Sequence, residues 1–506
     1  MKKNLIPSTT QKKQSPPLLN GKGHNKLVPL KQFSIKPAVI QEAKELPHCN
    51  HKKAGCCKKC KKPTAIHSLP FTISKSGKYC LSKDLLYSGD SIAIVIQATT
   101  VELDLNNHNL LINNPNAIGI SVNDSSNVSI KNGTIVLLTE QTDESIGVGV
   151  SISDSNKVAL ENLFISNFSF GIVIVSSTEI SLLKVRSQNA LQSNLSTTEV
   201  RGLNLKNVFF INDATVIGTA GVALRRTNEV NVYNSNFINS DIFYVGGSVA
   251  NFDKIRVEIT DVNYPFGALQ LGTATVSTDS VIAVTDVIIQ NSVLVNRSNQ
   301  GSVTGDSLAP AVIFLSTGKN FLIQDCVLSM DPQLPYAEAL PLNAVIAIGS
   351  SNEPRLINLI GSGENPPTNV SNIVIQDCLI NGPSVYNVVI GSDPENEVQV
   401  SKVTLKENNI SDASQYNIFL LNVNRVVIKE NAINNSDANA GGILVDGDST
   451  KNIIRNNDII VDGQYGISLT ASTSGNIVKE NVIISQLGIS NLGANLLIDN
   501  TVSNQQ

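Results

Sequence analysis

A six-residue pattern, apolar-x-x-Asn-x-apolar, recurs along this chain with different residues in the same positions. It is clearest in NRVVIKENAI, where Ile428, Asn431 and Ile433 fill it. The asparagine position is also held by Asn408, Asn457, Asn481 and Asn500, and upstream by His108, Gly133, Leu163, Val185, Val208, Ser235, Val262, Ser292, Cys326 and Cys378. Most of these fifteen positions follow one another at intervals of 19 to 34 residues. A repeat of this period predicts a solenoid, here of about fifteen coils.

The coils are expected to be built from strands. A second segment, Gly-apolar-x-apolar, precedes most of the repeats, as in GIVIV from 171 and GILV from 442. Val, Ile, Asn, Ser and Gly dominate, whereas Met occurs twice and Trp is absent. We therefore predict an all-β chain in which each coil is strand, turn, strand, turn. Alternate side chains would fill the interior, and the asparagines would hydrogen-bond to one another and to local backbone, which makes them structural.

One stretch resembles a known family. Residues 70–112 read PFTISKSGKYCLSKDLLYSGDSIAIVIQATTVELDLNNHNLLI. This opening is similar to the start of right-handed parallel β-helix repeat proteins of the pectate-lyase-like superfamily, and the likeness extends over roughly 69–502. The resemblance implies one right-handed, single-stranded parallel β-helix domain over 68–506. Short strands over 71–90 would cover its first coil.

Residues 1–67 form the second part of the predicted organisation, a basic and largely disordered arm. Residues 1–62 hold 15 of the 38 Lys and Arg residues but only 2 of the 42 Asp and Glu residues, so the remaining chain carries a net charge of −17. Such an arm is either a tail that meets an anionic partner (nucleic acid, membrane or an acidic protein) or a solvated tether. The N-terminal sequence lacks the apolar core of a secretory signal peptide, and no run of eighteen apolar residues occurs. We therefore expect no Sec export and no membrane span, as in an intracellular protein or a virion or particle component.

A cluster of cysteines and histidines interrupts the arm. Six potential metal ligands fall within thirteen residues: His48, Cys49, His51, Cys56, Cys57 and Cys60. Cys57-x2-Cys60 has the spacing that zinc sites use. The alternatives are a pair of disulfides or reduced thiols without a ligand.

Two further cysteines share one column of the repeat. Cys326 and Cys378 are 52 residues apart, and two loops, 329–341 and 353–368, are expected to absorb the excess length. The thiols would then lie in adjacent coils, ~5 Å apart at the α-carbons. In-register side chains fit the torsion of a disulfide poorly, so two reduced buried thiols are expected.

The same register places Asp325 beside Asp377. Carboxylates ~5 Å apart could raise one pKa, act as an acid/base pair or share a calcium ion. The column continues as Glu407, Glu430 and Glu480, beside Lys406, Lys429, Arg455 and Lys479. Facing acidic and basic columns favour a solvated charge ladder over an active site.

A sugar-binding groove is the second candidate site. Aromatic residues and arginines concentrate between 164 and 297, and aromatic faces stack on sugars while Arg pairs with uronates. The candidate binding residues are Tyr233, Tyr244, Tyr264, Arg225 and Arg226; the weak catalytic candidates are Asp325, Asp377, Asp253, Asp261 and Arg256. The alternative is that the aromatic side chains fill the interior.

Two classes of function stay open. The Asp-Asp and His-Gly pairs of polygalacturonase-like chains and the Gly-Arg-Pro-Trp element of pectin-methylesterase-like chains are absent. The favoured function is therefore a non-catalytic scaffold that displays a surface for glycan or partner recognition. The alternative is a lyase or hydrolase of acidic polysaccharide. Because few residues follow Asn500, the last coil is expected to be uncapped and to self-associate or dock a partner.

Overall fold

The computed structural model describes residues 63–142, 144–212, 221–261, 267–272, 274–277, 280–298, 311–331, 344–349, 369–392, 399–463 and 465–504. All regular structure in these segments is β-strand. The chain divides into residues 1–61 and 62–506. Residues 1–62 of the arm, which include its Cys/His cluster, lie outside the described residues, whereas Thr64–Ile66 at its end form a strand. Within the described segments, no helix is long and apolar enough to cross a membrane.

The strands of residues 62–506 form three parallel stacks. Stack 1 is a sheet of sixteen strands. It consists of β2 (Phe71–Ile73), β5 (Ile92–Ile96), β8 (Ile118–Asn123), β10 (Val148–Ser153), β12 (Phe170–Val175), β15 (Ser193–Thr198), β18 (Val222–Arg225), β21 (Ile242–Val245), β24 (Leu269–Gly272), β29 (Ala311–Leu315), β32 (Ala344–Ile348), β35 (Tyr386–Gly391), β38 (Tyr416–Leu421), β41 (Gly441–Asp446), β44 (Ile467–Leu469) and β47 (Ile489–Asn491).

The other two stacks belong to one sheet of 31 strands. Stack 2 consists of β1 (Thr64–Ile66), β3 (Gly77–Leu81), β6 (Val101–Asp104), β9 (Ser126–Leu137), β11 (Asn156–Ser166), β13 (Thr178–Leu183), β16 (Arg201–Lys206), β19 (Asn228–Tyr233), β22 (Ser248–Asp253), β27 (Thr285–Gln290), β30 (Gly318–Gln324), β33 (Asn369–Gln376), β36 (Gln399–Lys406), β39 (Val427–Lys429), β42 (Ile453–Arg455), β45 (Ser474–Lys479) and β48 (Ala494–Ile498). Strands β9 and β11 run on into stack 3 and so join the two stacks.

Stack 3 holds the shorter strands that follow. It consists of β4 (Leu85–Tyr87), β7 (Asn109–Ile112), β14 (Arg186–Gln188), β17 (Phe209–Ile211), β20 (Asn236–Ile238), β23 (Arg256–Ile259), β28 (Val293–Asn296), β31 (Val327–Met330), β34 (Leu379–Asn381), β37 (Asn409–Ser411), β40 (Ala432–Asn435), β43 (Asp458–Val461), β46 (Val482–Ser485) and β49 (Thr501–Asn504). An antiparallel hairpin, β25 (Ala274–Ser277) and β26 (Ser280–Ile282), lies outside the stacks.

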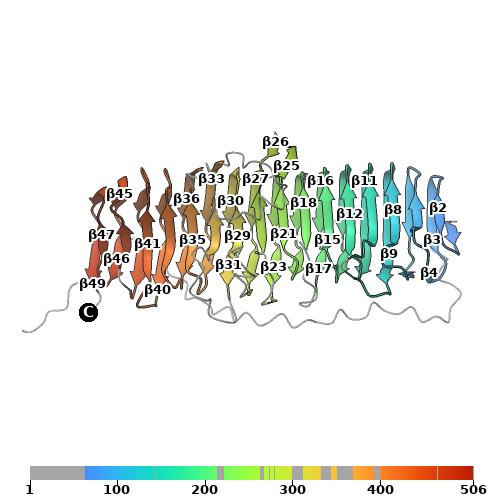
Figure 1. Ribbon diagram of the computed structural model, residues 1–506, viewed down its shortest axis with the longest axis horizontal. Coiled ribbons are helices and arrows are strands. Elements are labelled where there is room, and N and C mark those ends of the chain that lie inside the picture. The colour runs from blue at the N-terminus through green and yellow to red at the C-terminus, as the bar shows by residue number, and fades with distance from the viewer. Residues whose placement is uncertain are drawn as a thin grey trace, which may run out of the picture. The chain divides into compact units, whose positions relative to one another are not determined.

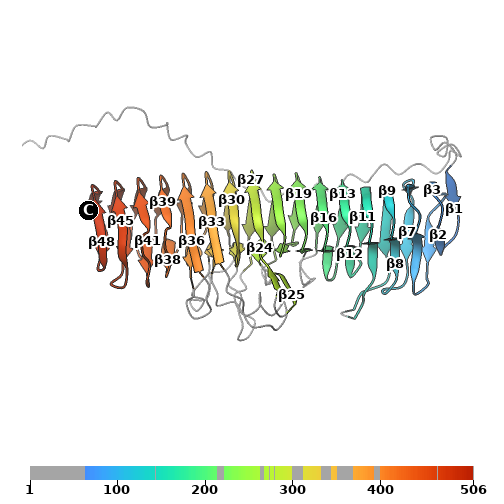
Figure 2. The same ribbon diagram turned by 90° about the horizontal axis from the view of Figure 1, so that it is seen from above.

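Each coil contributes one strand to each stack in turn, and successive coils lie side by side from β2 to β49 (Figure 1). Seen from above, the strands of stack 2 form one continuous row (Figure 2). Every pairing between coils is parallel, which is the architecture of a parallel β-helix. The inward positions form aliphatic columns such as Ile428, Ile454 and Val478, all fully buried.

A left-handed residue makes the turn between stack 2 and stack 3. Lys184, Asp325 and Glu430 occupy this position with φ between 53° and 59°. The residue after it, which is the asparagine position of the repeat, is buried. The predicted pattern therefore spans two strands, because the left-handed residue breaks NRVVIKENAI into β39 and β40. Each coil runs through three stacks where the sequence predicted two strands, and only β9 and β11 cross from stack 2 to stack 3 without a break among the described strands.

The asparagine column is a hydrogen-bonded ladder, as predicted. Asn408 Nδ2 donates to Asn431 Oδ1 at 3.0 Å, Asn431 donates to Asn457 at 2.9 Å, and Asn457 donates to Asn481 at 2.9 Å. The same oxygens accept backbone N–H groups of the preceding coil, as in Asn408 N to Asn431 Oδ1 at 3.0 Å. These asparagine side chains therefore have a structural role.

The register confirms most of the predicted columns and corrects one. Asn236 pairs with Arg256 and Arg256 with Val293, so Ile255 lies in the column between Ser235 and Ser292. The prediction had placed Val262 there, which is wrong. The prediction assumed similar spacing between successive columns, but the coil that ends at Ile255 is short and the coil from Ile255 to Ser292 is long. The segment GLNL from 202 also matches the Gly-apolar-x-apolar pattern, but it lies in β16 of stack 2, and β15 supplies stack 1 in that coil.

Cys326 and Cys378 lie in adjacent coils, as predicted. Val327 pairs with Leu379, and both cysteines are free and buried. Each thiol donates to the backbone carbonyl two residues before it, at 3.1 Å. The hydrogen bond with Cys326 and the burial of the site raise the pKa of the Cys378 thiol, which keeps it neutral.

The N-terminal strands continue the stacks. Strand β2 pairs with β5, β3 with β6, and β4 with β7. Strand β1 adds to β3, with Thr64 opposite Tyr79. The strands expected over 71–90 are therefore part of a regular coil, and β1 covers the edge of that coil in stack 2.

Candidate functional site

The outer face of stack 2 is the candidate site. In β36, Val403 and Leu405 are fully buried, whereas Thr404 and Lys406 alternate with them and face outward. The parallel register repeats this arrangement, so that Thr404 lies beside Val427 and Lys406 beside Lys429. The outward side chains therefore form columns along the β-helix, spaced ~4.8 Å apart from coil to coil.

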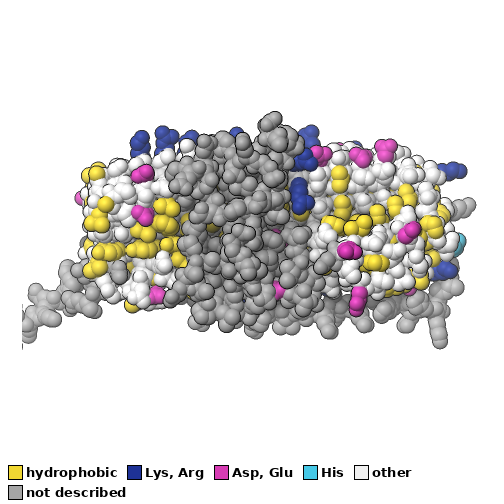
Figure 3. Space-filling model, in the orientation of Figure 1, with side chains coloured by type: hydrophobic (Ala, Val, Ile, Leu, Met, Phe, Trp, Pro, Cys, Tyr) yellow, Lys and Arg dark blue, Asp and Glu magenta, His cyan; other side chains and the backbone are white. Residues whose placement is uncertain are grey.

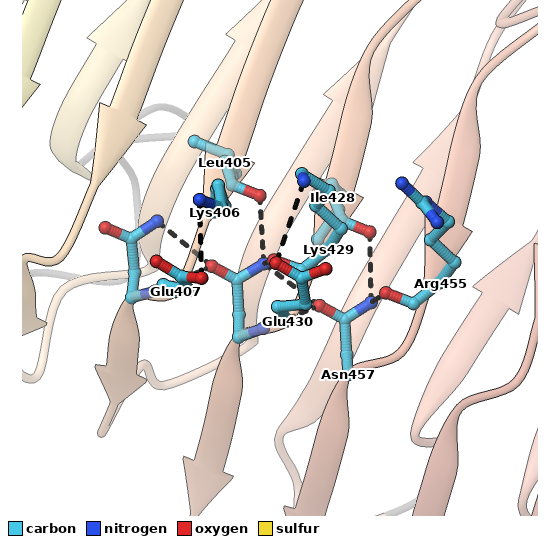
Figure 4. Close-up of polar contacts among 10 residues, drawn as sticks. Leu405, Lys406, Glu407, Ile428, Lys429, Glu430, Arg455 and Asn457 are labelled. Atoms are coloured by element: carbon cyan, nitrogen blue, oxygen red, sulfur yellow. Dashed lines mark hydrogen bonds and ion pairs between the residues drawn. The ribbon is translucent and has the colours of Figure 1, made fainter.

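A charge ladder occupies the C-terminal part of this face (Figure 4). Lys406, Lys429, Arg455 and Lys479 form one column in register. The adjoining turn positions carry acids, and the ion pairs join sequence neighbours: Lys406 to Glu407 at 3.3 Å, Lys429 to Glu430 at 3.6 Å and Lys479 to Glu480 at 3.6 Å. The predicted ladder is confirmed for these three coils.

Asp325 and Asp377 extend the acidic column, but without lysines beside them. Gln324 and Gln376 hold the cation position and pair in register, which confirms that the two aspartates are coil neighbours. Both side chains are exposed. Partial burial, together with the nearby carboxylates of Glu407 and Asp325, raises the pKa of Asp377 above its ordinary value. The carboxyl therefore resists ionisation in the folded state.

This shift gives a pH-dependent effect. A carboxyl whose pKa is raised by folding stabilises the protein below pH 3.8, the ordinary pKa of the group. This stabilisation is lost as the pH rises through the pKa of the folded state. Asp377→Asn should therefore stabilise the protein at pH 7 relative to pH 3, by roughly a few tenths of a kcal/mol because solvent screens the site. Urea unfolding at both pH values measures the difference. Asp154→Asn, in another left-handed turn, is the control; equal gains at both pH values would contradict the prediction.

Metal sites stay predictions. Across the described segments, no group of three or more His, Cys, Asp or Glu side chains is arranged to hold a metal ion. Asp325 and Asp377 supply two carboxylates, so calcium binding there would need further oxygen ligands from water or from a bound molecule. The candidate zinc ligands His48, Cys49, His51, Cys56, Cys57 and Cys60 lie outside the described residues.

Tyr233 is the best placed of the predicted sugar-binding residues. It ends β19 on the outer face of stack 2 and is 38% exposed. Lys206 and Lys254 lie over its ring, at 5.9 Å and 5.2 Å from the centroid, and Lys254 Nζ donates to the phenolic oxygen at 3.2 Å. Because both ammonium groups lie over the ring in cation–π contacts, the surface at Tyr233 presents cations and not a free aromatic face for stacking.

The rest of the predicted groove is not assembled around Tyr233. Tyr244 was expected to bind sugar at the surface, and that is wrong, because the ring is fully buried and its hydroxyl donates to the Thr227 carbonyl at 2.9 Å. The alternative interpretation, interior filling, holds for this residue. Arg225 ends β18 in stack 1, and Arg226 pairs with Glu199 at 3.0 Å. Tyr264 lies outside the described residues.

The weak catalytic candidates of this region are also separate. Arg256 donates to Glu258 at 2.6 Å in stack 3, where Arg297 also approaches Glu258 at 3.5 Å. Asp253 accepts a hydrogen bond from Asn291 at 2.9 Å in the ladder of stack 2. Asp261 is buried, and its backbone N–H donates to Asn239 Oδ1 at 3.1 Å. These residues make structural contacts in different parts of their coils, so they form no common site with one another.

The sequence analysis missed a second column of cations. Lys402, Arg425 and Lys451 occupy left-handed positions at the start of stack 2, with φ between 56° and 59°. Bridges between Ser401, Asn424 and Thr450 place them in register. A spacing of four residues could have revealed them, because Lys402, Arg425 and Lys451 each precede a member of the first cation column by four.

Interior columns become exposed in the last described coil. Leu497 lies next to Val478, and Val502 lies next to Ile483. Val478 and Ile483 are fully buried, whereas Leu497 is 41% and Val502 43% exposed. Self-association or docking at this coil stays a prediction.

Comparisons with known proteins agree with the architecture. Residues 357–506 match the family model described as a right handed beta helix region. The prediction of a right-handed parallel β-helix and the resemblance to proteins of that fold are confirmed. No curated protein matches the sequence.

Solved structures with a similar trace come from several organisms. PfbA, a surface adhesin of Streptococcus pneumoniae, is 15% identical with a TM-score of 0.37, covering 78% of this chain and 84% of that one. The tailspike protein of E. coli bacteriophage HK620, solved with a pentasaccharide, is 11% identical with a TM-score of 0.44, covering 84% and 72%. The A-module of an Azotobacter vinelandii mannuronan C-5 epimerase is 10% identical with a TM-score of 0.26, covering 85% and 92%.

Proposed function

We propose that this parallel β-helix is a non-catalytic scaffold that binds glycans along the outer face of stack 2. The observation that carries the proposal is the repetition of polar side chains in register on that face. A surface that repeats from coil to coil suits a ligand that also repeats, because each added unit makes the same contacts as the last. A linear polysaccharide is such a ligand.

The polar side chains are held in place before any ligand arrives. Gln324 Nε2 donates to Gln290 Oε1 at 3.1 Å. In the left-handed column at the start of the stack 2 strands, Asn372 donates to Asn320 at 2.7 Å, and Asn320 donates to Asp286 at 2.7 Å. These ladders fix the orientation of amide groups whose remaining donors and acceptors can meet sugar hydroxyls. Ordering the side chains in advance lowers the entropic cost of binding.

A glycan array probed with the full chain tests the proposal. Binding to at least one class of linear polysaccharide, with no reducing sugar or unsaturated product released from the bound glycan, is the expected result. Gln324→Ala with Gln376→Ala should weaken that binding about tenfold, because two coils lose their amide contacts. The control is Gln415→Ala with Gln486→Ala, the same change at positions outside stack 2. No binding to any glycan would refute the proposal.

One observation favours the alternative, cleavage of an acidic polysaccharide. Asp377 has a raised pKa and a second carboxylate in the next coil, which is the minimal equipment for acid/base chemistry. If the protein turns over a polysaccharide, Asp377→Asn should abolish the release of products while Asp154→Asn leaves it unchanged. Turnover that survives in Asp377→Asn would exclude this pair as the catalytic site.

A further inference from the structure

The Lys and Arg residues of the C-terminal coils are gathered on one face of the β-helix. Residues 399–506 contain seven Lys and Arg residues: Lys402, Lys406, Arg425, Lys429, Lys451, Arg455 and Lys479. All seven belong to the two cation columns of stack 2, and we name them the basic strip. Lys and Arg side chains gather along the upper margin over the C-terminal coils in Figure 3. Residues 63–506 as a whole carry 23 basic against 40 acidic side chains, so the strip stands out against an acidic body.

The strip is only partly neutralised. Lys406, Lys429 and Lys479 pair with the glutamates beside them. Among the described residues, no ion pair within 4.0 Å involves the other four cations. Like charges opposite one another on adjacent strands are destabilising. A polyanion lying along the strip would relieve this repulsion, since each of its charges could meet a cation in successive coils.

The shape of the strip favours a thin linear ligand. Its two rows are four residues apart, at most roughly 13 Å, and successive cations in a row are ~4.8 Å apart along the β-helix. Between the rows run Thr404, Val427, Ile453 and Ile477, all partly exposed. This aliphatic column can pack against the C–H faces of sugar rings while the rows on either side meet acidic groups.

Nucleic acid is a poorer match for the same surface. Proteins that bind single strands without sequence preference use aromatic side chains as stacking platforms, and the column between the two rows is aliphatic. The acidic column of Glu407, Glu430, Glu480 and Asp499 borders the row of Lys406 and would repel a wide duplex backbone.

We infer that the basic strip binds a linear acidic polysaccharide, carboxylated or sulfated, aligned with the β-helix axis. This inference rests on the proposed glycan-binding function and adds the chemical class of the ligand and its place on stack 2. The affinity is electrostatic and therefore falls with ionic strength.

Binding of the full chain to polygalacturonate, heparin, neutral dextran and single-stranded poly(dT), at 50 and 200 mM NaCl, tests the inference. The probe variant is Arg425→Gln/Lys429→Gln/Arg455→Gln. The matched control is Lys157→Gln/Lys184→Gln/Lys319→Gln, which removes the same charge from exposed positions in or beside stack 2. Far-UV circular dichroism and thermal unfolding verify that both variants fold.

We expect at least one acidic polysaccharide to bind, with affinity more than tenfold lower in the probe variant and less than twofold lower in the control. Equal losses in both variants would overturn the assignment to the strip. Tighter binding of poly(dT) than of either acidic polysaccharide would overturn the ligand class. Binding of dextran without binding of either acidic polysaccharide would contradict this inference but agree with the proposed function. Failure to bind any glycan would contradict both.

Discussion

Asn431→Ala is expected to lower the free energy of unfolding by about 3–4 kcal/mol. The Asn431 side chain is buried. Its oxygen accepts from the backbone and side-chain nitrogens of Asn408, and the two hydrogens of its Nδ2 are shared among three acceptors, the carbonyls of Leu405 and Lys429 and Asn457 Oδ1. Alanine leaves donors and acceptors of two adjacent coils buried without partners, and each such group costs about 1–3 kcal/mol.

The measurement is the shift of the urea midpoint, combined with hydrogen exchange at the Asn408 amide. That amide should exchange faster in the variant because its acceptor is gone. Asn434→Ala is the matched control, since it removes a partly exposed asparagine from the same coil. Equal shifts for the two variants would show that the ladder contributes no more than a surface asparagine.

Gly149→Ala is expected to destabilise the protein by about 2–3 kcal/mol through overpacking. A Cβ at this position would lie 2.4 Å from Ile165 Cγ2 and 2.6 Å from the carbonyl oxygen of Gly171. The second contact is with backbone of the next coil, which cannot move without separating β10 from β12. The expected destabilisation is purely steric, because the φ angle of Gly149 is not in the left-handed region and alanine therefore causes no backbone strain.

Thermal unfolding measures this effect, with Gly391→Ala as the control. Gly391 also belongs to stack 1, but the nearest atom to its added Cβ is Leu421 Cβ at 4.0 Å. We expect the control to change stability by less than about 0.5 kcal/mol. If Gly149→Ala is as stable as Gly391→Ala, the coils can separate locally and the packing argument fails.

The sequence predicted most of the fold because each coil places the same kinds of side chain in the same interior positions. An inward aliphatic position, an asparagine and a glycine recur at fixed offsets, so alignment of the repeats gave the neighbours of Cys326 and Asn431 without a structure. The alignment failed where the coils change length. Val262 was chosen because it preserved an average spacing, whereas the register selects Ile255.

The candidate site was predicted less completely than the fold. The Lys–Glu ladder was visible because its members are adjacent in sequence and fall in the known column. Composition alone suggested the groove with Tyr244, but composition does not distinguish an aromatic side chain that faces inward from one that faces outward. Arg225 and Tyr233 are eight residues apart, yet they belong to different stacks because the chain turns between β18 and β19.

By itself, the sequence determined the repeat, its all-β character and the columns of asparagine, cysteine and charge, since these depend on local periodicity that every coil reproduces. Only the tertiary structure decided which residues turn the corners. Left-handed positions such as Lys402, Arg425 and Lys451 carry no distinctive residue type. Their four-residue spacing from the first cation column is visible in the sequence, but only the stacking of the coils places them at turns and in register with one another. The basic strip exists because parallel pairing brings residues 402 to 479 onto one face.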